Sequence, residues 1–202
     1  MAFNTFIKQY IKRHPVNAIL LMINIIFLVA SLLFSLFFQI DLVALGAIHQ
    51  SSILVNHEYY RIITAMFIHA NILHFLSNMV VLYYLGGHME KLIGPRKYAL
   101  LYLSAGLASS LVVTFFSTGY TVGASGAIYG VMGGLFMLTI LRKYWFHPKA
   151  ISSIQQLMAL NLILTFVIPN ISVMGHLGGL FMGVVLFFFM TPKHPYFFDQ
   201  RL

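Results

Sequence analysis

The chain has 202 residues, of which 60% are hydrophobic and 8% are charged, and its formal net charge is +8. A soluble domain carries about 25% charged residues, so this composition excludes a water-soluble globular protein and predicts an integral membrane protein with one membrane domain. The absence of cysteine from the sequence excludes disulfide bonds and thiolate chemistry.

Six apolar stretches follow one another along the chain and predict an all-α membrane protein, a bundle of six transmembrane helices. They cover approximately Ala18–Phe38, Ile62–Leu85, Tyr98–Phe116, Gly126–Leu141, Ile154–Ile168 and Val173–Phe189. A helix needs ~20 apolar residues to cross the hydrocarbon core, so the first three stretches are long enough and the last three are short. A short helix that begins below the membrane surface leaves room for water above it. Polar tails at 1–15 and 191–202 flank the membrane domain at 16–190.

The positions of the basic residues predict the orientation of the chain. All but one of the 12 Lys and Arg residues lie in the two tails or in the second-to-third and fourth-to-fifth connections, and the exception is Arg61. By the positive-inside rule both termini are cytoplasmic, and the fourth and sixth spans begin toward the outer face. The excess of basic residues is then explained by the orientation of the chain in the membrane, and it gives no support to nucleic-acid binding. We expect a multi-pass plasma membrane protein, and the small size favours a bacterial cell membrane.

The first outer connection, from Gln39 to Arg61, is longer and more apolar than an ordinary polar loop. Amphipathic segments of this kind lie in the interface between lipid and water. We therefore expect part of this connection to rest in the bilayer interface instead of projecting into water.

Polar side chains occur inside two of the apolar spans. The second span contains His69, His74 and Asn78, and the sixth opens with His176. Ionisable groups at membrane depth are costly and are candidates for function. His74 and Asn78 are four residues apart, so they share one helical face. A lone buried histidine more often bonds a backbone carbonyl, and an asparagine can simply join two helices, so neither establishes a site alone.

The fourth span begins with the stretch GASGAIYG, in which Ser125 is flanked by Gly123 and Gly126. Similar glycine-serine patterns surround the nucleophile of many serine hydrolases. Glycines then repeat every four residues in the fourth and sixth spans, at 126, 130 and 134 and at 175, 179 and 183. Such stripes let helix backbones approach closely in lipid, although they also serve packing alone. If the two stripes meet, Ser125 and His176 lie at similar depth and within hydrogen-bond reach.

Together these residues supply a nucleophile, a base and donors for an oxyanion, and they resemble a known family, the rhomboid intramembrane serine proteases. The resemblance extends from the first span to the sixth. Tyr60 stands where the family usually has Trp, and it keeps an aromatic anchor at the interface. The five matching motifs are, in chain order, YR (Tyr60, Arg61), HANILHFLSN (His69, His74, Asn78), EKLIGPRKY (Glu90 to Tyr98), GASGAIYG (Ser125) and HLGGLFMG (His176, Gly179, Gly183).

The resemblance implies a role for each matching residue. Ser125 is the expected nucleophile, and His176 is the expected general base and then general acid. The oxyanion hole is expected to use His74, Asn78 and the Ser125 backbone N–H. Tyr129 is expected to pack on the His176 ring. The remaining supporting residues are His69, nearer the outer surface, and Gly123, Gly126, Gly179, Gly183, Arg61 and Glu90.

The implied activity is that of an intramembrane serine endopeptidase that cuts transmembrane segments of other membrane proteins near the outer membrane face. The Ser-His pair resembles a dyad, since no Asp or Glu lies in the middle of any span. The expected partners are transmembrane protein substrates and the lipid bilayer, with no nucleic acid. No cofactor and no metal is expected.

Three alternatives stay open. A small transporter also places polar residues inside its spans, although intramembrane carboxylates and an evident internal repeat are missing. A metal or haem site could use His69, His74 and His176, but helical spacing would turn the first two rings apart by ~140°. A non-catalytic scaffold that binds membrane helices would share the fold, and it gives no reason to retain both Ser125 and His176.

Overall fold

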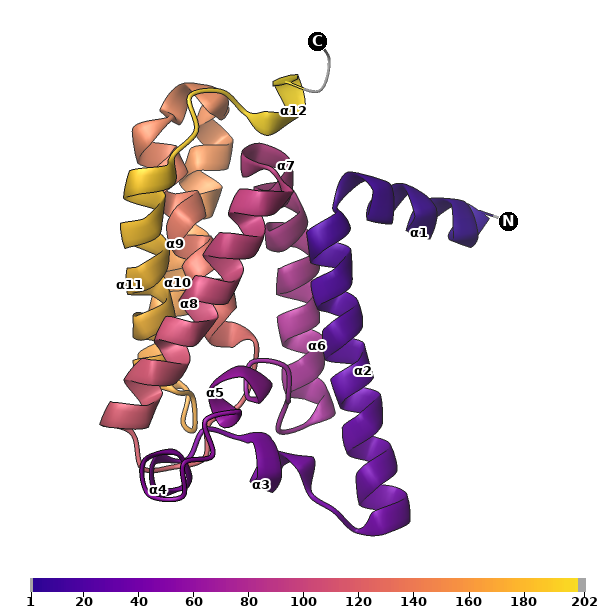
Figure 1. Cartoon of the computed structure of the whole chain (residues 1–202). Helices are drawn as coiled ribbons and strands as arrows, with labels where there is room; N and C mark the ends of the chain where they lie inside the picture. Colours follow the sequence, from indigo (N-terminus) through magenta and orange to yellow (C-terminus); the bar gives the residue numbers. More distant parts are fainter. Residues whose placement is uncertain (1, 200–202) are drawn as a thin grey trace.

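The computed structural model describes residues 2–199 as a bundle of helices (Figure 1). Within this range the regular elements are helices, apart from an isolated bridge between Ile48 and Thr121. Arg201, part of the predicted tail at 191–202, lies outside the described residues. The elements are α1 (Ala2–Arg13), α2 (Pro15–Phe38), α3 (Leu42–Gly46), α4 (Gln50–Leu54), α5 (Arg61–Thr64), α6 (Ile72–Val81), the π-helix η1 (Leu82–Gly86), α7 (Gly87–Ile93), α8 (Pro95–Phe116), α9 (Ser125–Leu141), the 3₁₀ turn η2 (Lys143–Trp145), α10 (Pro148–Val167), α11 (Val173–Met190) and α12 (Tyr196–Asp199).

Among the described residues, four helices are long and apolar enough to cross a membrane, namely α2, α8, α10 and α11. They confirm a multi-pass, all-helical membrane protein. α9 is apolar but has only 17 residues, in line with the short span predicted there. The prediction of a short fifth span is wrong, because α10 begins at Pro148 and has 20 residues. The polar stretch ISSIQQ, residues 151–156, lowers the local hydropathy but belongs to the first turns of this helix.

The second predicted span, Ile62–Leu85, is not one helix. Its first residues form the single turn α5, an irregular segment follows, and α6 starts only at Ile72. Asn71 caps α6, because its backbone is extended and its side chain accepts a hydrogen bond from the His74 N–H at 2.8 Å. From there α6, η1 and α7 run on without a break to Ile93. The count of six spanning helices therefore stays a prediction.

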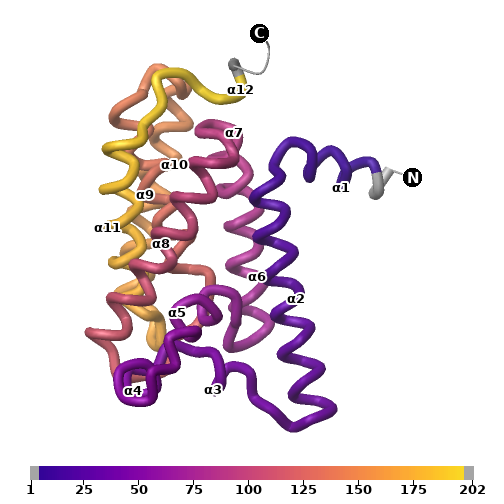
Figure 2. Tube along the Cα trace, in the orientation of Figure 1, coloured from indigo at the N-terminus to yellow at the C-terminus, as the bar shows by residue number. Residues whose placement is uncertain are grey.

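The centre of the bundle is formed by α8, α9 and α11, which lie against one another along their lengths (Figures 1 and 2). The predicted meeting of the glycine stripes on α9 and α11 is confirmed. A Cβ atom at Gly179 would lie 1.9 Å from the backbone oxygen of Gly126, and one at Gly183 would lie 2.1 Å from that of Gly130. Any side chain at these positions would push the two backbones apart, so the glycines set the distance between the helices.

The start of α2 is fixed to the bundle by Glu90 of α7. The first N–H groups of a helix have no partner within it, and here the Glu90 carboxylate accepts hydrogen bonds from the backbone N–H groups of Val16 and Asn17, at 2.9 and 2.8 Å. Burial raises the pKa of the Glu90 carboxyl, and these two donors oppose that shift. The predicted N-terminal tail is itself helical, and α1 meets the start of α2 at a steep angle (Figure 2).

Candidate active site

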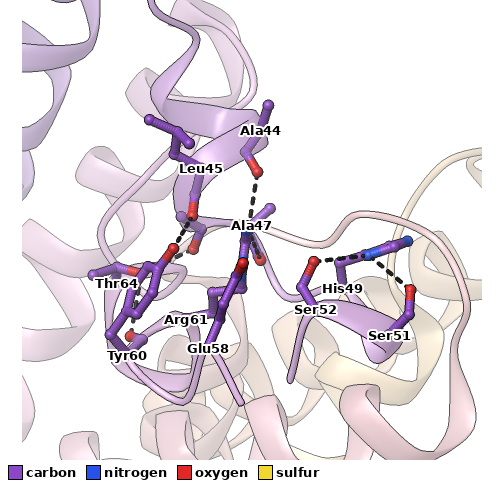
Figure 3. Close-up of polar contacts among 11 residues, drawn as sticks. Ala44, Leu45, Ala47, His49, Ser51, Ser52, Glu58, Tyr60, Arg61 and Thr64 are labelled. Atoms are coloured by element: carbon purple, nitrogen blue, oxygen red, sulfur yellow. Dashed lines mark hydrogen bonds and ion pairs between the residues drawn. The ribbon is translucent and has the colours of Figure 1, made fainter. Parts of the chain in front are cut away.

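The connection between α2 and α6 is organised around Arg61. Its side chain is buried, pairs with Glu58 at 2.5 Å and donates hydrogen bonds to the backbone carbonyls of Ala44 and Ala47 at 2.9 and 3.0 Å (Figure 3). The neighbouring Tyr60 hydroxyl donates to a third carbonyl, in α3, at 3.1 Å. The planar guanidinium group suits this task because it presents several donors in fixed directions. Arg61 thus holds the connection in one shape.

This connection in turn holds the loop that leads into α9. Ile48 and Thr121 exchange two backbone hydrogen bonds, of 2.9 and 3.0 Å, and the Gly123 N–H donates to the backbone oxygen of Ala65 at 2.8 Å. Gly123 has a φ of +124°, which L side chains rarely adopt, and an added Cβ would lie 2.7 Å from the His74 ring. Both its backbone and its surroundings therefore require glycine at this position.

Ser125 and His74 border the same space, and Asn78 lies one turn after His74 on α6. Ser125 is the first residue of α9 and is partly exposed, and no hydrogen bond of its backbone N–H is found among the described residues. A Cβ on Gly123 would be 2.9 Å from Nε2 of His74 and 3.8 Å from Oγ of Ser125, so the two side chains face a common point. The Asn78 side chain is buried and donates one N–H to the His74 carbonyl at 2.8 Å, which leaves its second N–H available.

His176 lies in the first turn of α11, and 8% of its surface is exposed. Its ring stacks on Tyr129 with 3.9 Å between the ring centres and 17° between the planes, as predicted for this pair. Nδ1 lies 3.0 Å from the hydroxyl oxygen of Thr165 on α10. Among the described residues no hydrogen bond joins Ser125 Oγ to His176, so a proton transfer between them would require the two groups to move closer together. Catalytic hydrogen bonds are often long before substrate binds.

Thr165 is the site residue that the sequence analysis missed. A threonine within an apolar helix usually donates to the carbonyl four residues earlier, and Thr165 does so to Asn161 at 2.9 Å. Nothing in the sequence distinguishes it from Thr114, which makes the same bond to Ser110. Only the three-dimensional contact with His176 sets Thr165 apart.

The expectation that the His69 and His74 rings diverge is wrong. Since α6 begins at Ile72, His69 lies in the preceding segment, and its ring centre is 5.2 Å from that of His74 with the planes at 72°. Both ring nitrogens of His69 are buried without a hydrogen-bond partner. Among residues 2–199 no group of three or more His, Asp or Glu side chains is arranged to hold a metal ion.

One segment that matches a family model contains the whole candidate cluster, which is His69, His74, Asn78, Ser125, Tyr129, Thr165 and His176. The Rhomboid domain model matches residues 56–193 of the chain. The chain belongs to the rhomboid family. The match contains the segment before α6, the start of α9 and the start of α11, and it therefore includes every residue of the cluster described above.

Two relatives show the range of the rhomboid family. The Rhomboid protease GluP of Bacillus subtilis (strain 168) is 33% identical over 142 residues, which are 70% of this chain and 28% of GluP. RHOMBOID-like protein 1 of Arabidopsis thaliana is 32% identical over 168 residues, which are 81% of this chain and 43% of the relative. The chain thus spans less than half the length of either.

A third relative shows that family membership alone does not decide activity. Inactive RHOMBOID-like protein 8 of Arabidopsis thaliana is 28% identical to this rhomboid over 140 residues, which are 67% of this chain and 39% of the relative. Whether a rhomboid chain cuts has to be argued from its own residues.

Proposed function

We propose that this rhomboid is an intramembrane serine endopeptidase that uses Ser125 as nucleophile and His176 as general base. The observation that carries the proposal is the backbone contact between α9 and α11 at Gly126 and Gly179. This contact brings together the first turns of the two helices, where Ser125 and His176 are located. Tyr129 lies one turn along α9 from Ser125 and stacks on the His176 ring. This contact links the helix turn that carries Ser125 to the His176 side chain.

The reaction follows from the chemistry of the two side chains. A serine hydroxyl is a weak nucleophile, and an adjacent neutral imidazole activates it by taking its proton. Ser125 Oγ forms a bond to the peptide carbonyl carbon while its proton passes to Nε2 of His176. The tetrahedral intermediate then expels the amine, which takes that proton from His176 as it leaves. Water hydrolyses the acyl-serine ester in the same two steps and restores both side chains.

The negative oxygen of the intermediate needs donors close to lipid. The backbone N–H of Ser125 has no partner among the described residues, and the ring of His74 faces Ser125 across Gly123. Asn78 lies one turn after His74 on α6 and has a second N–H to donate. Loss of one such donor typically costs ~3 kcal/mol of transition-state stabilisation. We assign the oxyanion hole to these three groups, with His69 supporting the ring of His74.

The substrate class follows from the position of the cluster. Ser125 and His176 each lie in the first turn of a helix, and α9 is entered from the end of the bundle where the loop between α8 and α9 lies. A transmembrane segment that enters there presents its backbone near the membrane surface. By the distribution of Lys and Arg this end is the outer face of a plasma membrane, with both termini cytoplasmic. The proposed reaction uses groups of the protein alone, with no cofactor or metal.

The test is covalent labelling by a fluorophosphonate in liposomes, together with cleavage of a membrane-anchored reporter. The wild-type protein is expected to label and to cut, whereas Ser125→Ala and His176→Ala lose both. Ser153→Ala is the matched control, because Ser153 is exposed and donates only to a carbonyl of its own helix. Folded wild-type protein that neither labels nor cuts would establish the non-catalytic scaffold in place of the protease.

A further inference from the structure

Three oxygen atoms from α9 and α10 lie in contact with one another, and one of them, the Thr165 hydroxyl, reaches Nδ1 of His176. The Thr165 hydroxyl lies 3.0 Å from Nδ1 of His176, 2.6 Å from the Tyr129 hydroxyl and 2.9 Å from the backbone oxygen of Asn161. The Tyr129 hydroxyl also lies 2.8 Å from the Asn161 oxygen. Thr165 is 1% exposed, so each of these four contacts has to be satisfied within the protein.

Counting protons decides how the neutral His176 ring is protonated. The Thr165 and Tyr129 hydroxyls bring one proton each, and the Asn161 carbonyl brings none. With its own proton on Nδ1, His176 supplies a third, and three of the four contacts become hydrogen bonds. With the proton on Nε2, only two protons are present, and two contacts set lone pair against lone pair in a buried site. The arrangement therefore favours the Nδ1–H tautomer.

We propose that Thr165 is a positioning residue that accepts a hydrogen bond from Nδ1–H of His176 and so leaves Nε2 free for the Ser125 proton. The inference rests on the proposed protease activity. Stacking on Tyr129 fixes the plane of the ring, but it acts equally on both tautomers and on a ring turned over within that plane. The contact with Thr165 selects one tautomer of the His176 ring. Thr165 lies on α10, a third helix beside those that carry the serine and the histidine.

Thr165→Val tests the proposal, since valine keeps the size and branching of threonine and removes the hydroxyl. We expect the fluorophosphonate labelling rate and the kcat for reporter cleavage to fall roughly tenfold or more, the effect of one buried hydrogen bond, with little change in KM. Thr165→Ser keeps the hydroxyl and is expected to restore most of both rates. Thr114→Val is the control, because Thr114 is equally buried and makes the same bond within its helix, away from His176.

A second measurement reads the tautomer of His176 directly in the wild-type protein. In wild-type protein with ¹⁵N-labelled histidine rings, we expect His176, assigned by comparison with His176→Ala, to carry its proton on Nδ1. In Thr165→Val we expect that preference to be reduced or lost. A purely structural role for Thr165 would change stability without changing the tautomer.

The outcomes separate the two proposals. If wild-type protein is folded but does not label, the protease proposal fails. If wild-type protein labels while Thr165→Val labels at the same rate, or if His176 carries its proton on Nε2 in the wild-type protein, the positioning role is overturned and the protease proposal stands.

Discussion

At the scale of single residues, His176 is contacted by side chains from two other helices, Tyr129 on α9 and Thr165 on α10. Tyr129 and His176 stack as expected from the family motifs. His69 was placed on the wrong element, because apolar periodicity continued through a segment that Asn71 interrupts with an extended backbone. The contact between Thr165 and His176 joins two helices, and no local pattern encodes such a contact.

Gly123 gives a prediction at this scale. Gly123→Ala is expected to destabilise the fold by about 1–3 kcal/mol, because its φ of +124° is strained for alanine and its Cβ would collide with His74. We also expect labelling of Ser125 to fall, since the collision displaces an oxyanion donor. Thermal unfolding in detergent and the labelling rate measure the two effects.

Gly119→Ala is the control for this substitution. Gly119 lies four residues earlier in the same loop, and its added Cβ would have no heavy atom within 4 Å. Its melting temperature and labelling rate are expected to match the wild type. Equal behaviour of the two variants would contradict the role given to Gly123.

At the scale of elements, the glycine stripes were readable because a spacing of four residues marks one face of a helix. The length of α10 could not be predicted from hydropathy, because serine and glutamine lower the hydropathy and so suggest a loop. A helix that begins at the membrane surface can carry such polar residues in its first turns. The break before α6 could not be predicted from hydropathy either. Hydropathy measures how apolar a segment is and does not register the hydrogen bonds at which a helix begins or ends.

Gly179→Ala tests the contact between α9 and α11. A methyl group there would lie 1.9 Å from the Gly126 oxygen, so the helices have to separate, at a cost of about 1–3 kcal/mol. We expect both the melting temperature and the cleavage rate to fall. Phe181→Ala on the same helix removes a side chain that is 70% exposed, and its smaller effect serves as the comparison. A Gly179→Ala protein with wild-type activity would refute the close contact.

At the scale of the whole molecule, the orientation of the chain decides on which side of the membrane the candidate site lies. The structure places α1 and α12 at the same end of the bundle, and the loop between α8 and α9 at the other (Figure 1). This arrangement agrees with two termini on one side of the membrane. Which side that is was predicted from charge alone, since the shape of the molecule is compatible with either orientation.

The lack of cysteine makes the orientation easy to test. Gly119→Cys, in the open loop before α9, is expected to react with a membrane-impermeant maleimide on intact cells. Tyr144→Cys, in the connection before α10, where Tyr144 is 72% exposed, is expected to react only after the membrane is permeabilised. The reverse pattern would place the site at the cytoplasmic face.

The pairing of α9 with α11 also bears on the order in which the proposed dyad is assembled. During synthesis Ser125 is made before His176, because α10 and the loops around it lie between them in the chain. If these two residues form the proposed dyad, a chain that stalls in this interval carries the nucleophile without its base. In the proposed mechanism the protein cannot cut until α11 has packed against α9.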